Sequence, residues 1–242
     1  MGAVIEYKNV QKKYGEQAVV ENFNLAVSKG EFVTIIGSSG SGKTTILKMV
    51  NGLILPDQGT VYVNGKDIIK EGLIALRRNI GYAIQGSVLF PHMTIEKNIA
   101  YVPNLLNKRD KKRTKAAVKK WIEIVGLEEE MLERYPDEIS GGQQQRVGIA
   151  RALAASPDIL VMDEPFGAVD EITRVQLQDE ISRIHKQTEI TIMFVTHDIK
   201  EALRLGTKVL VMNRGEIQQF AEPEEIMEAP QTDFVEQLVH SR

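Results

Sequence analysis

The first third of the chain alternates apolar runs with turn residues, as β-strands and their connections do. Ala18 to Val27 and Glu31 to Ile36 are apolar runs of strand length. Lys43 to Val50 has the pattern of a helix, and Gly52 is its expected C′ residue. Asn64-Gly65 follows another apolar run and is typical of a two-residue hairpin turn. This part of the chain therefore predicts strands, one short helix and a hairpin.

The middle of the chain, from Pro91 to Ala155, changes to a helical and charged pattern. Apolar residues recur there at spacings of three and four, which places them on one face of a helix. That face comprises Val118, Trp121, Ile122 and Val125. Gly126 follows directly and is expected to end the helix.

The strand pattern returns in the last third of the chain. Ile159 to Met162 and Ile190 to Val195 are apolar runs of the β type, with a helical stretch between them. The buried face of that helix is expected to comprise Leu177, Ile181 and Ile184. Strand, helix and strand in succession predict a parallel sheet with covering helices. Asn213-Arg214-Gly215 gives a second hairpin signal. The prediction is an α/β core interrupted by a helical insertion.

Composition narrows the class of protein. The chain has 242 residues, 43% of them hydrophobic, which is ample for a buried core. Its net charge of -3 gives no basic field, so we expect no nucleic-acid partner. The absence of cysteine excludes a disulfide framework and a thiolate zinc site. No run approaches the roughly 18 apolar residues that cross a bilayer, and Met1 to Val10 lacks a signal-peptide core. We therefore expect a soluble protein.

Residues 37–44 read Gly-Ser-Ser-Gly-Ser-Gly-Lys-Thr, between an apolar strand and a helix. Small residues let successive backbone N–H groups curl around phosphate oxygens, and the helix N-terminus adds its dipole. Lys43 is expected to reach the β- and γ-phosphates, and the Thr44 hydroxyl to bind Mg²⁺. A flexible Gly/Ser loop is the alternative, but the strand–helix context favours a loop that binds the phosphates of a nucleotide together with Mg²⁺. The predicted nucleotide-binding residues are Gly37, Ser38, Ser39, Gly40, Ser41, Gly42, Lys43, Thr44 and Thr45.

Two carboxylates, Asp163 and Glu164, directly follow the apolar run that starts at Ile159. In open parallel sheets, ligands bind at the carboxyl ends of strands. We expect Asp163 to support Mg²⁺, through water, and Glu164 to polarise the attacking water as a general base. Two solvated carboxylates are the alternative, and the phosphate-binding sequence upstream favours the catalytic interpretation.

Residues 140–145 read Ser-Gly-Gly-Gln-Gln-Gln and precede a helix that runs through Arg146 and Leu153. Ser140 is the expected N-cap, which makes this a second helix terminus suited to an anion. The segment resembles the signature motif of ABC ATPases, and it lies just upstream of the Asp163-Glu164 pair, as in that family. The match extends over nearly the whole chain, from Tyr14 to the hairpin near Arg214.

The resemblance assigns roles to further residues. Tyr14 resembles the aromatic residue that stacks on adenine, and Gln85 resembles the glutamine that senses Mg²⁺ and water. Thr196-His197-Asp198 carries the histidine that would contact the γ-phosphate. Ala168-Val169-Asp170 resembles the loop that crosses the dimer interface, where Leu is commoner than Val169. The implied catalytic residues are thus Glu164, His197 and Gln85, and the implied Mg²⁺ ligands are Thr44, Gln85 and Asp163.

The resemblance also implies an architecture and a partner. The fold would be a P-loop NTPase core (RecA-like, mainly parallel sheet) with an antiparallel β subdomain and an inserted ABC α-helical subdomain. One ABC ATPase domain would span 1–242, with the core in 1–85 and 156–242 and the helical subdomain in 86–155. A second copy would bind head to tail. Its contribution to each ATP would come from Ser140, Gly141, Gly142 and Gln143.

The sequence around the motifs is similar to the ATPase sequences of importers of osmoprotectants and quaternary amines, of the glycine betaine and choline type. The similarity rests on Leu89 to Ile95, Arg134-Tyr135-Pro136 and Phe166 to Arg174. It implies a peripheral subunit at the cytoplasmic face of the membrane, bound to permease subunits and served indirectly by a substrate-binding protein. Leu89, Phe90 and Met93 are candidate anchors for the permease, and packing within the insertion is the alternative.

Other functions stay open on the sequence alone. The cargo could be an amino acid or another small solute. A soluble ABC ATPase without a membrane partner is disfavoured, because those proteins usually carry tandem ATPase domains or long coiled-coil insertions. A small-molecule kinase would lack the helix start at Ser140. A regulator that holds ATP without turnover is disfavoured by Glu164 and His197.

Overall fold

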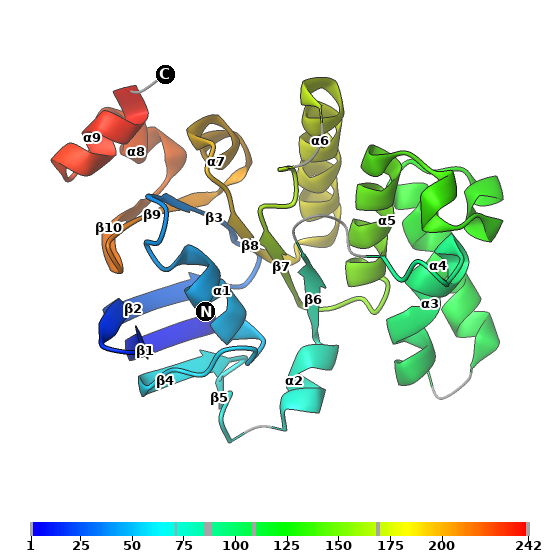
Figure 1. Cartoon of the computed structure of the whole chain (residues 1–242), viewed down its shortest axis with the longest axis horizontal. Coiled ribbons are helices and arrows are strands. Elements are labelled where there is room, and N and C mark those ends of the chain that lie inside the picture. The colour runs from blue at the N-terminus through cyan, green and yellow to red at the C-terminus, as the bar shows by residue number, and fades with distance from the viewer. Residues whose placement is uncertain (1, 71, 85–88, 108–109, 168–169, 241–242) are drawn as a thin grey trace. The chain divides into compact units, whose positions relative to one another are not determined.

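The computed structural model describes residues 2–70, 72–84, 89–107, 110–167 and 170–240 (Figure 1). The chain forms two compact units, and each is described by itself. The first unit comprises Met1–Arg77 and Glu189–Arg242, and the second comprises Arg78–Thr188.

The first unit contains an antiparallel sheet in the order β2-β1-β4-β5. Its strands are β1 (Ala3–Tyr14), β2 (Gln17–Ser28), β4 (Gln58–Val63) and β5 (Lys66–Asp67). Asn64 and Gly65, with φ of 51° and 75°, form the predicted hairpin turn between β4 and β5. The buried hydroxyl of Tyr7 donates a hydrogen bond to the Ile46 carbonyl at 2.8 Å, which ties this sheet to α1 (Lys43–Val50).

The first unit also holds strands in the order β10-β9-β3-β8. They are β3 (Phe32–Gly37), β8 (Thr191–Val195), β9 (Lys208–Asn213) and β10 (Glu216–Ala221). Strand β3 pairs in parallel with β8 and β9, and its residues Phe32 to Ile36 are buried, as a central parallel strand requires. Strands β9 and β10 pair antiparallel through the predicted turn at Arg214 and Gly215, with φ of 48° and 84°.

Within the described ranges, four further helices belong to the first unit or end at its boundary. They are α2 (Leu73–Arg78), α7 (Ile199–Leu205), α8 (Pro223–Glu228) and α9 (Asp233–His240). The Arg77 guanidinium donates to the carbonyls of Asn51 and Gly52 at 3.1 and 2.9 Å, so α2 is held to the end of α1. Helices α7, α8 and α9 share a core with β3, β9 and β10. Its fully buried members include Ile36, Val209, Val211, Ala202, Ile226 and Val235.

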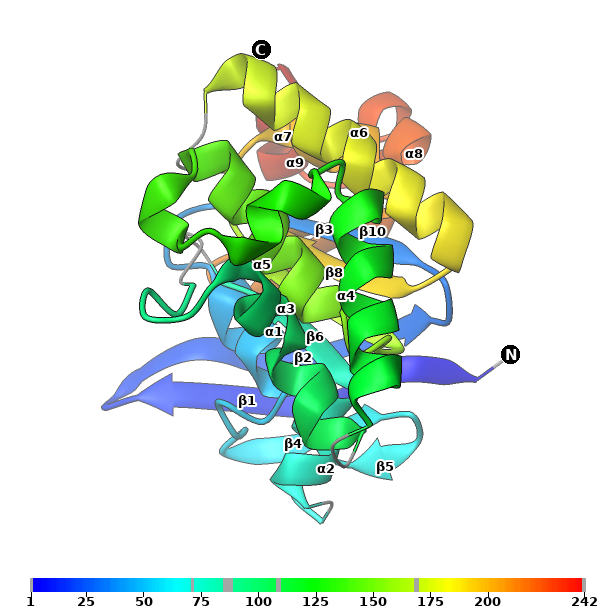
Figure 2. The same cartoon turned by 90° about the vertical axis from the view of Figure 1, so that its right-hand side faces the viewer.

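The second unit pairs β6 (Ile80–Ala83) in parallel with β7 (Ile159–Asp163). Its helices are α3 (Ile95–Leu106), α4 (Lys111–Ile124), α5 (Gly141–Leu153) and α6 (Glu171–Thr188), with 3₁₀ turns at Glu129–Glu133 and Pro136–Glu138. Figure 2 shows α3 and α4 side by side. No helix in the described ranges is both long enough and apolar enough to span a bilayer.

The structure confirms the predicted fold class, a mainly parallel α/β core with an antiparallel sheet and a helical region. The buried face predicted for α4 is buried throughout, and the chain leaves that helix at Gly126, whose φ is 65°. Gly52, with φ of 63°, is the C′ residue of α1, as predicted. The limits of the helical subdomain, 86–155, stay a prediction.

Candidate active site

The phosphate loop lies in the first unit, between β3 and α1. Gly37, Gly40 and Gly42 have φ of 155°, 74° and 93°. A Cβ on Gly37 would lie 1.8 Å from the Met212 carbonyl oxygen, and one on Gly42 would lie 2.8 Å from Val20 Cγ2. Gly37 is thus required by the close approach of β9, and Gly42 by the close approach of β2. All three glycines have a backbone conformation that residues with a side chain rarely adopt.

Lys43 begins α1 and folds back over this loop. The residue is 9% exposed, and Nζ donates to the carbonyls of Gly37 and Ser38 at 3.0 and 2.8 Å. The Ser38 hydroxyl is itself hydrogen-bonded to Asn213 Oδ1 at 2.8 Å, at the end of β9. A positive charge is therefore held inside a loop of small residues at a helix N-terminus, an arrangement that binds a polyphosphate.

The hydroxyl residues of the loop differ in exposure. Ser39 is exposed, Thr44 is half-buried and Thr45 is buried. Ser41 is 1% exposed, and its Oγ has no hydrogen-bond partner within the described residues. An orphaned buried hydroxyl inside a phosphate loop is a group that a bound ligand can satisfy.

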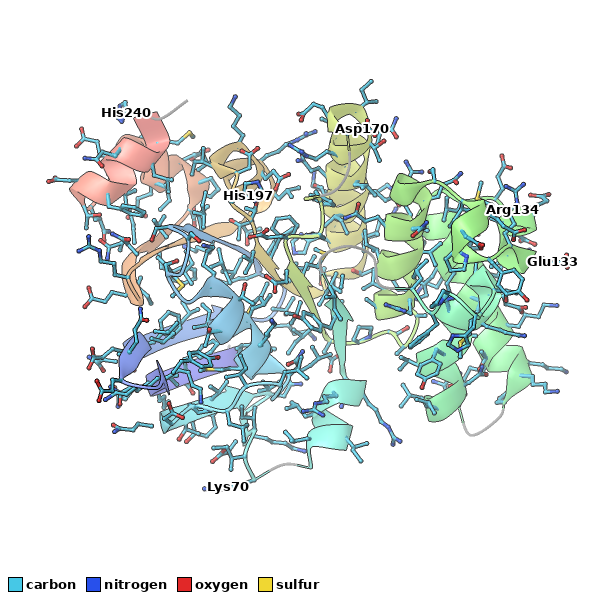
Figure 3. All side chains as sticks on the ribbon, in the orientation of Figure 1. Lys70, Glu133, Arg134, Asp170, His197 and His240 are labelled. Atoms are coloured by element: carbon cyan, nitrogen blue, oxygen red, sulfur yellow. The ribbon has the colours of Figure 1, made fainter. Side chains whose placement is uncertain are left out.

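Two other predicted residues also belong to the first unit. Tyr14 ends β1 with half of its surface exposed, and Lys12 Nζ lies 5.7 Å from the centroid of its ring. His197 is exposed between β8 and α7, close to the start of that helix (Figure 3). Thr196 precedes His197, and its Oγ1 donates to Glu201 Oε2 at 2.5 Å. The same oxygen accepts from the N–H of Asp198, the residue after His197, at 3.0 Å. The backbone that carries the imidazole is therefore fixed on both sides.

The carboxylate pair lies in the second unit, at the end of β7. Asp163 is 8% exposed, and Glu164 is half-buried with φ of 43°. A glutamate in the left-handed region costs of order 1–3 kcal/mol, and such strain accumulates at functional sites. Burial and the nearby negative charge of Asp163 raise the pKa of Tyr82 to about 12.

The helix start at Ser140 has the predicted geometry. Ser140 Oγ accepts from the Gln143 N–H at 3.3 Å, and Gln143 Oε1 accepts from the Ser140 N–H at 2.9 Å, which forms a capping box. Apart from the neighbouring backbone of α5 itself, no heavy atom of the described chain would lie within 4 Å of a Cβ on Gly141, whereas one on Gly142 would lie 2.6 Å from Thr173 Cγ2. Gly141 thus faces open space, and Gly142 packs against α6.

A cavity of about 300 Å³ lies beside this helix start. Its polar lining includes Ser140, Gln143, Arg146, Thr173 and Gln176. The Arg146 guanidinium donates to the Gly126 carbonyl at 3.3 Å and to Gln176 Oε1 at 3.1 Å. The first turn of α5 therefore borders a polar hollow that contains a fixed positive charge.

Some predicted residues fall elsewhere. Gln85, Ala168 and Val169 lie outside the described residues. Asp170, labelled in Figure 3, accepts from the Thr173 N–H at 3.0 Å, and this backbone bond holds the pKa of its carboxyl below the usual value. This bond places the carboxylate at the N-terminal turn of α6.

The segment that contains Leu89 packs within the second unit. Leu89 is 6% exposed, so it belongs to the core rather than to an exposed anchor surface. The Phe90 ring lies 4.9 Å from that of Tyr101, and the Arg151 guanidinium lies 5.2 Å above it. For Leu89 the structure favours packing within the insertion over docking.

Sequence reasoning missed two sets of residues around these sites. Asn98 is fully buried; its Oδ1 accepts from the Phe90 N–H at 2.8 Å, and its amide donates to three carbonyls between Phe90 and Thr94. Asp57 pairs with Lys12 next to Tyr14. Each set joins separate segments of the chain. The only local signals were a polar residue on the apolar side of α3 and a lysine two positions before Tyr14.

Comparison with known proteins agrees with this picture. A family described as ABC transporter matches residues 20–167. The carnitine transport ATP-binding protein OpuCA of Listeria monocytogenes is 48% identical over 98% of this chain and 59% of its own length. The glycine betaine uptake system ATP-binding protein YehX of Escherichia coli (strain K12) is 47% identical over 97% of this chain and 76% of its own. The chain thus spans about three-fifths of the length of OpuCA.

A solved structure extends the similarity to three dimensions. It is the dimeric post-hydrolysis state of the ATP-binding cassette MJ0796, bound to ADP and Pi. The TM-score is 0.80 and the identity 33%, with 90% of this chain and 98% of that chain covered.

Proposed function

This chain belongs to the ABC transporter family, and we propose that it binds and hydrolyses MgATP to power an importer of osmoprotectants. The observation that carries the proposal is the phosphate loop, with Lys43 folded over glycines that close packing requires. In phosphoryl transfer a protein mainly positions groups and neutralises charge, and this loop is built for both.

Each described site contributes one part of the proposed chemistry. The backbone N–H groups of the loop and the Lys43 ammonium hold the β- and γ-phosphates, and the Tyr14 ring stacks on the base. Glu164 accepts the proton of the attacking water as a general base. His197 donates a hydrogen bond to the γ-phosphate and responds to the loss of that phosphate. Gln85, outside the described residues, would sense the metal and the attacking water.

Each of the two proposed ligands in the described ranges, taken by itself, has a group that Mg²⁺ prefers. Thr44 offers a hydroxyl and Asp163 a nearly buried carboxylate, and Mg²⁺ prefers such oxygen ligands while it keeps several waters. Bound there, the ion neutralises phosphate charge. Thr44 would hold it directly and Asp163 through water, so that these side chains fix the orientation of the phosphates.

The proposed site is completed by a second copy of the chain. The Ser140 hydroxyl, the N–H groups of Gly141 and Gly142 and the amide group of Gln143 lie at a helix terminus, which suits an anion. Gly141 faces open space, as a group that contacts a ligand from another protomer must. The dimeric ADP-bound state of MJ0796 supports this arrangement.

The proposed cargo is a quaternary amine of the glycine betaine or choline type. Support comes from relatives whose names specify carnitine transport and glycine betaine uptake, at 48% and 47% identity. The cargo does not touch an ATPase subunit, so an importer of amino acids or another small solute is the alternative. The chain would act at the cytoplasmic face of the membrane, bound to permease subunits that a substrate-binding protein serves.

The variant Glu164→Gln tests the chemistry. It keeps the shape of the side chain but removes the base, so phosphate release should fall by about 10²- to 10⁴-fold while ATP binding persists. ATP that is bound but not hydrolysed should also hold two copies together. Light scattering detects the resulting dimer by its mass. Glu189→Gln is a matched control, because Glu189 is exposed and has φ of 51° outside the site. Unchanged turnover in Glu164→Gln would remove Glu164 from the mechanism.

The same variants test the cargo in cells whose own copy of the gene is deleted. Uptake of labelled glycine betaine should return with the unmodified chain and with Glu189→Gln, but not with Glu164→Gln. Uptake that never depended on this chain would contradict the proposed cargo and leave the hydrolysis result intact.

A further inference from the structure

The ring of Tyr14 sits beside an ion pair that the proposed chemistry does not use. Lys12 Nζ lies 2.7 Å from Asp57 Oδ1 and 5.7 Å from the centroid of the Tyr14 ring. We propose that Asp57 and Lys12 are positioning residues that orient Tyr14 for stacking on the adenine base. The inference rests on the proposed role of Tyr14 in binding ATP.

Asp57 holds the end of β1 at two points. Its second oxygen, Oδ2, accepts from the Lys13 N–H at 2.7 Å, and its own N–H donates to the Gln11 carbonyl at 2.9 Å. Two hydrogen bonds lower the pKa of the Asp57 carboxyl, the one from Lys12 more than the one from the Lys13 N–H. The carboxyl group is therefore ionised in neutral solution. One carboxylate therefore fixes both residues that precede Tyr14.

The strand needs such a support at this place. The pairing of β1 with β2 is irregular between Val10 and Lys12 and again between Lys12 and Lys13. Bulges of this kind leave ladder groups without their regular partners and bend the strand. Asp57 supplies the Lys13 N–H with an acceptor from outside β1 and β2, so the direction of the last strand residues does not depend on the ladder alone.

Lys12 covers one face of the Tyr14 ring and so determines which face a base can reach. Its side chain is 17% exposed, and its ammonium lies over the ring of Tyr14 at a distance typical of a cation–π contact. A ring that holds a cation on one face offers the other face to a base. The cation also draws the electrons of the ring toward itself, which favours stacking of an electron-rich purine on the opposite face.

Strand β1 also carries a lysine with the same two kinds of contact, which serves for comparison. Lys8 lies 3.1 Å from Glu6 and 5.1 Å from the centroid of the Tyr62 ring. That trio, with Lys8 and Glu6 on β1 and Tyr62 on β4, repeats the chemistry of Lys12, Asp57 and Tyr14 away from the proposed nucleotide site. The variant Lys8→Met is therefore a matched control for Lys12→Met.

The test measures binding of ATP and of inorganic tripolyphosphate, which has no base, to the purified chain by titration calorimetry. We expect Lys12→Met and Asp57→Asn to weaken ATP binding by about two- to fivefold, the range of an exposed cation–π contact. Tripolyphosphate binding should not change, because the phosphate loop is intact. Lys8→Met should bind both ligands as the unmodified chain does.

Two results would overturn the inference. Unchanged ATP affinity in Lys12→Met and Asp57→Asn would show that Tyr14 needs no such support. An equal loss for tripolyphosphate would show that the pair acts on the phosphates or on the fold. The variant Tyr14→Ala separates the two proposals. If it weakens ATP binding while the other two variants do not, only the inference fails; if it has no effect, the stacking role of Tyr14 fails as well.

Discussion

Gly37 and Gly40 occupy one loop, yet a methyl group at each would meet different surroundings. On Gly37 it would collide with the Met212 carbonyl, whereas on Gly40 it would meet no heavy atom of the described residues within 4 Å. Gly40→Ala carries only the strain of its φ of 74° and should lower the free energy of unfolding by about 1 kcal/mol. Gly37→Ala should cost roughly 3 kcal/mol or more. Urea denaturation measures both, and equal losses would contradict the close approach of β9.

Single residues were predictable where the chemistry is local. The spacing of Gly37, Gly42 and Lys43 identified the phosphate loop, since the motif carries its own backbone requirements. The left-handed backbone of Glu164 had no signal, because its conformation is imposed by its surroundings and glutamate does not favour it. The contact between Lys12 and Asp57 was equally hidden, since 45 positions separate them.

Helix α5 allows the proposed contact with a second copy to be tested without disturbing the fold. Gly141 and Gly148 both belong to this helix, and beyond the adjacent helix backbone a methyl group on either would meet no heavy atom of the described residues within 4 Å. Gly148→Ala should raise the free energy of unfolding by about 0.5–1 kcal/mol and leave turnover unchanged. Gly141→Ala should keep the fold but lower turnover by about tenfold or more, because it displaces the phosphate of the partner's ATP. Steady-state phosphate release distinguishes them, and equal turnover would exclude Gly141 from the site.

At the scale of elements, the ends of helices were predicted well and the irregular segments poorly. Ser140 and Gly126 act on their own neighbours through capping and left-handed backbone, so their effect was visible in the sequence. The segment after Leu89 depends instead on Asn98 and Arg151, which come from α3 and α5. Long-range polar contacts of this kind leave no periodic pattern.

At the scale of the whole molecule, the succession of β7, α6 and β8 followed from hydrophobic periodicity, because buried parallel strands need continuous apolar runs. The division of the chain into two compact units at Arg78 and Thr188 could not be predicted from this periodicity, because compactness depends on contacts between distant segments. The residues of the proposed site come from both units: Lys43 belongs to the first, and Ser140 and Glu164 belong to the second. A function that needs all three therefore depends on more than either unit supplies.

Complementation between inactive variants tests whether two copies share each site. In a head-to-tail dimer, Lys43→Ala destroys one half of a site and Gly141→Asp the other, so an equimolar mixture should recover about a quarter of normal turnover, from one intact site in about half of the dimers. Gly141→Asp suits the fold, since it faces open space at a helix N-terminus, but its charge repels phosphate. Lys43→Ala mixed with Glu164→Gln is the control: both act on the same half, so nothing should recover. Equal recovery in the two mixtures, or none in either, would contradict a site built from two protomers.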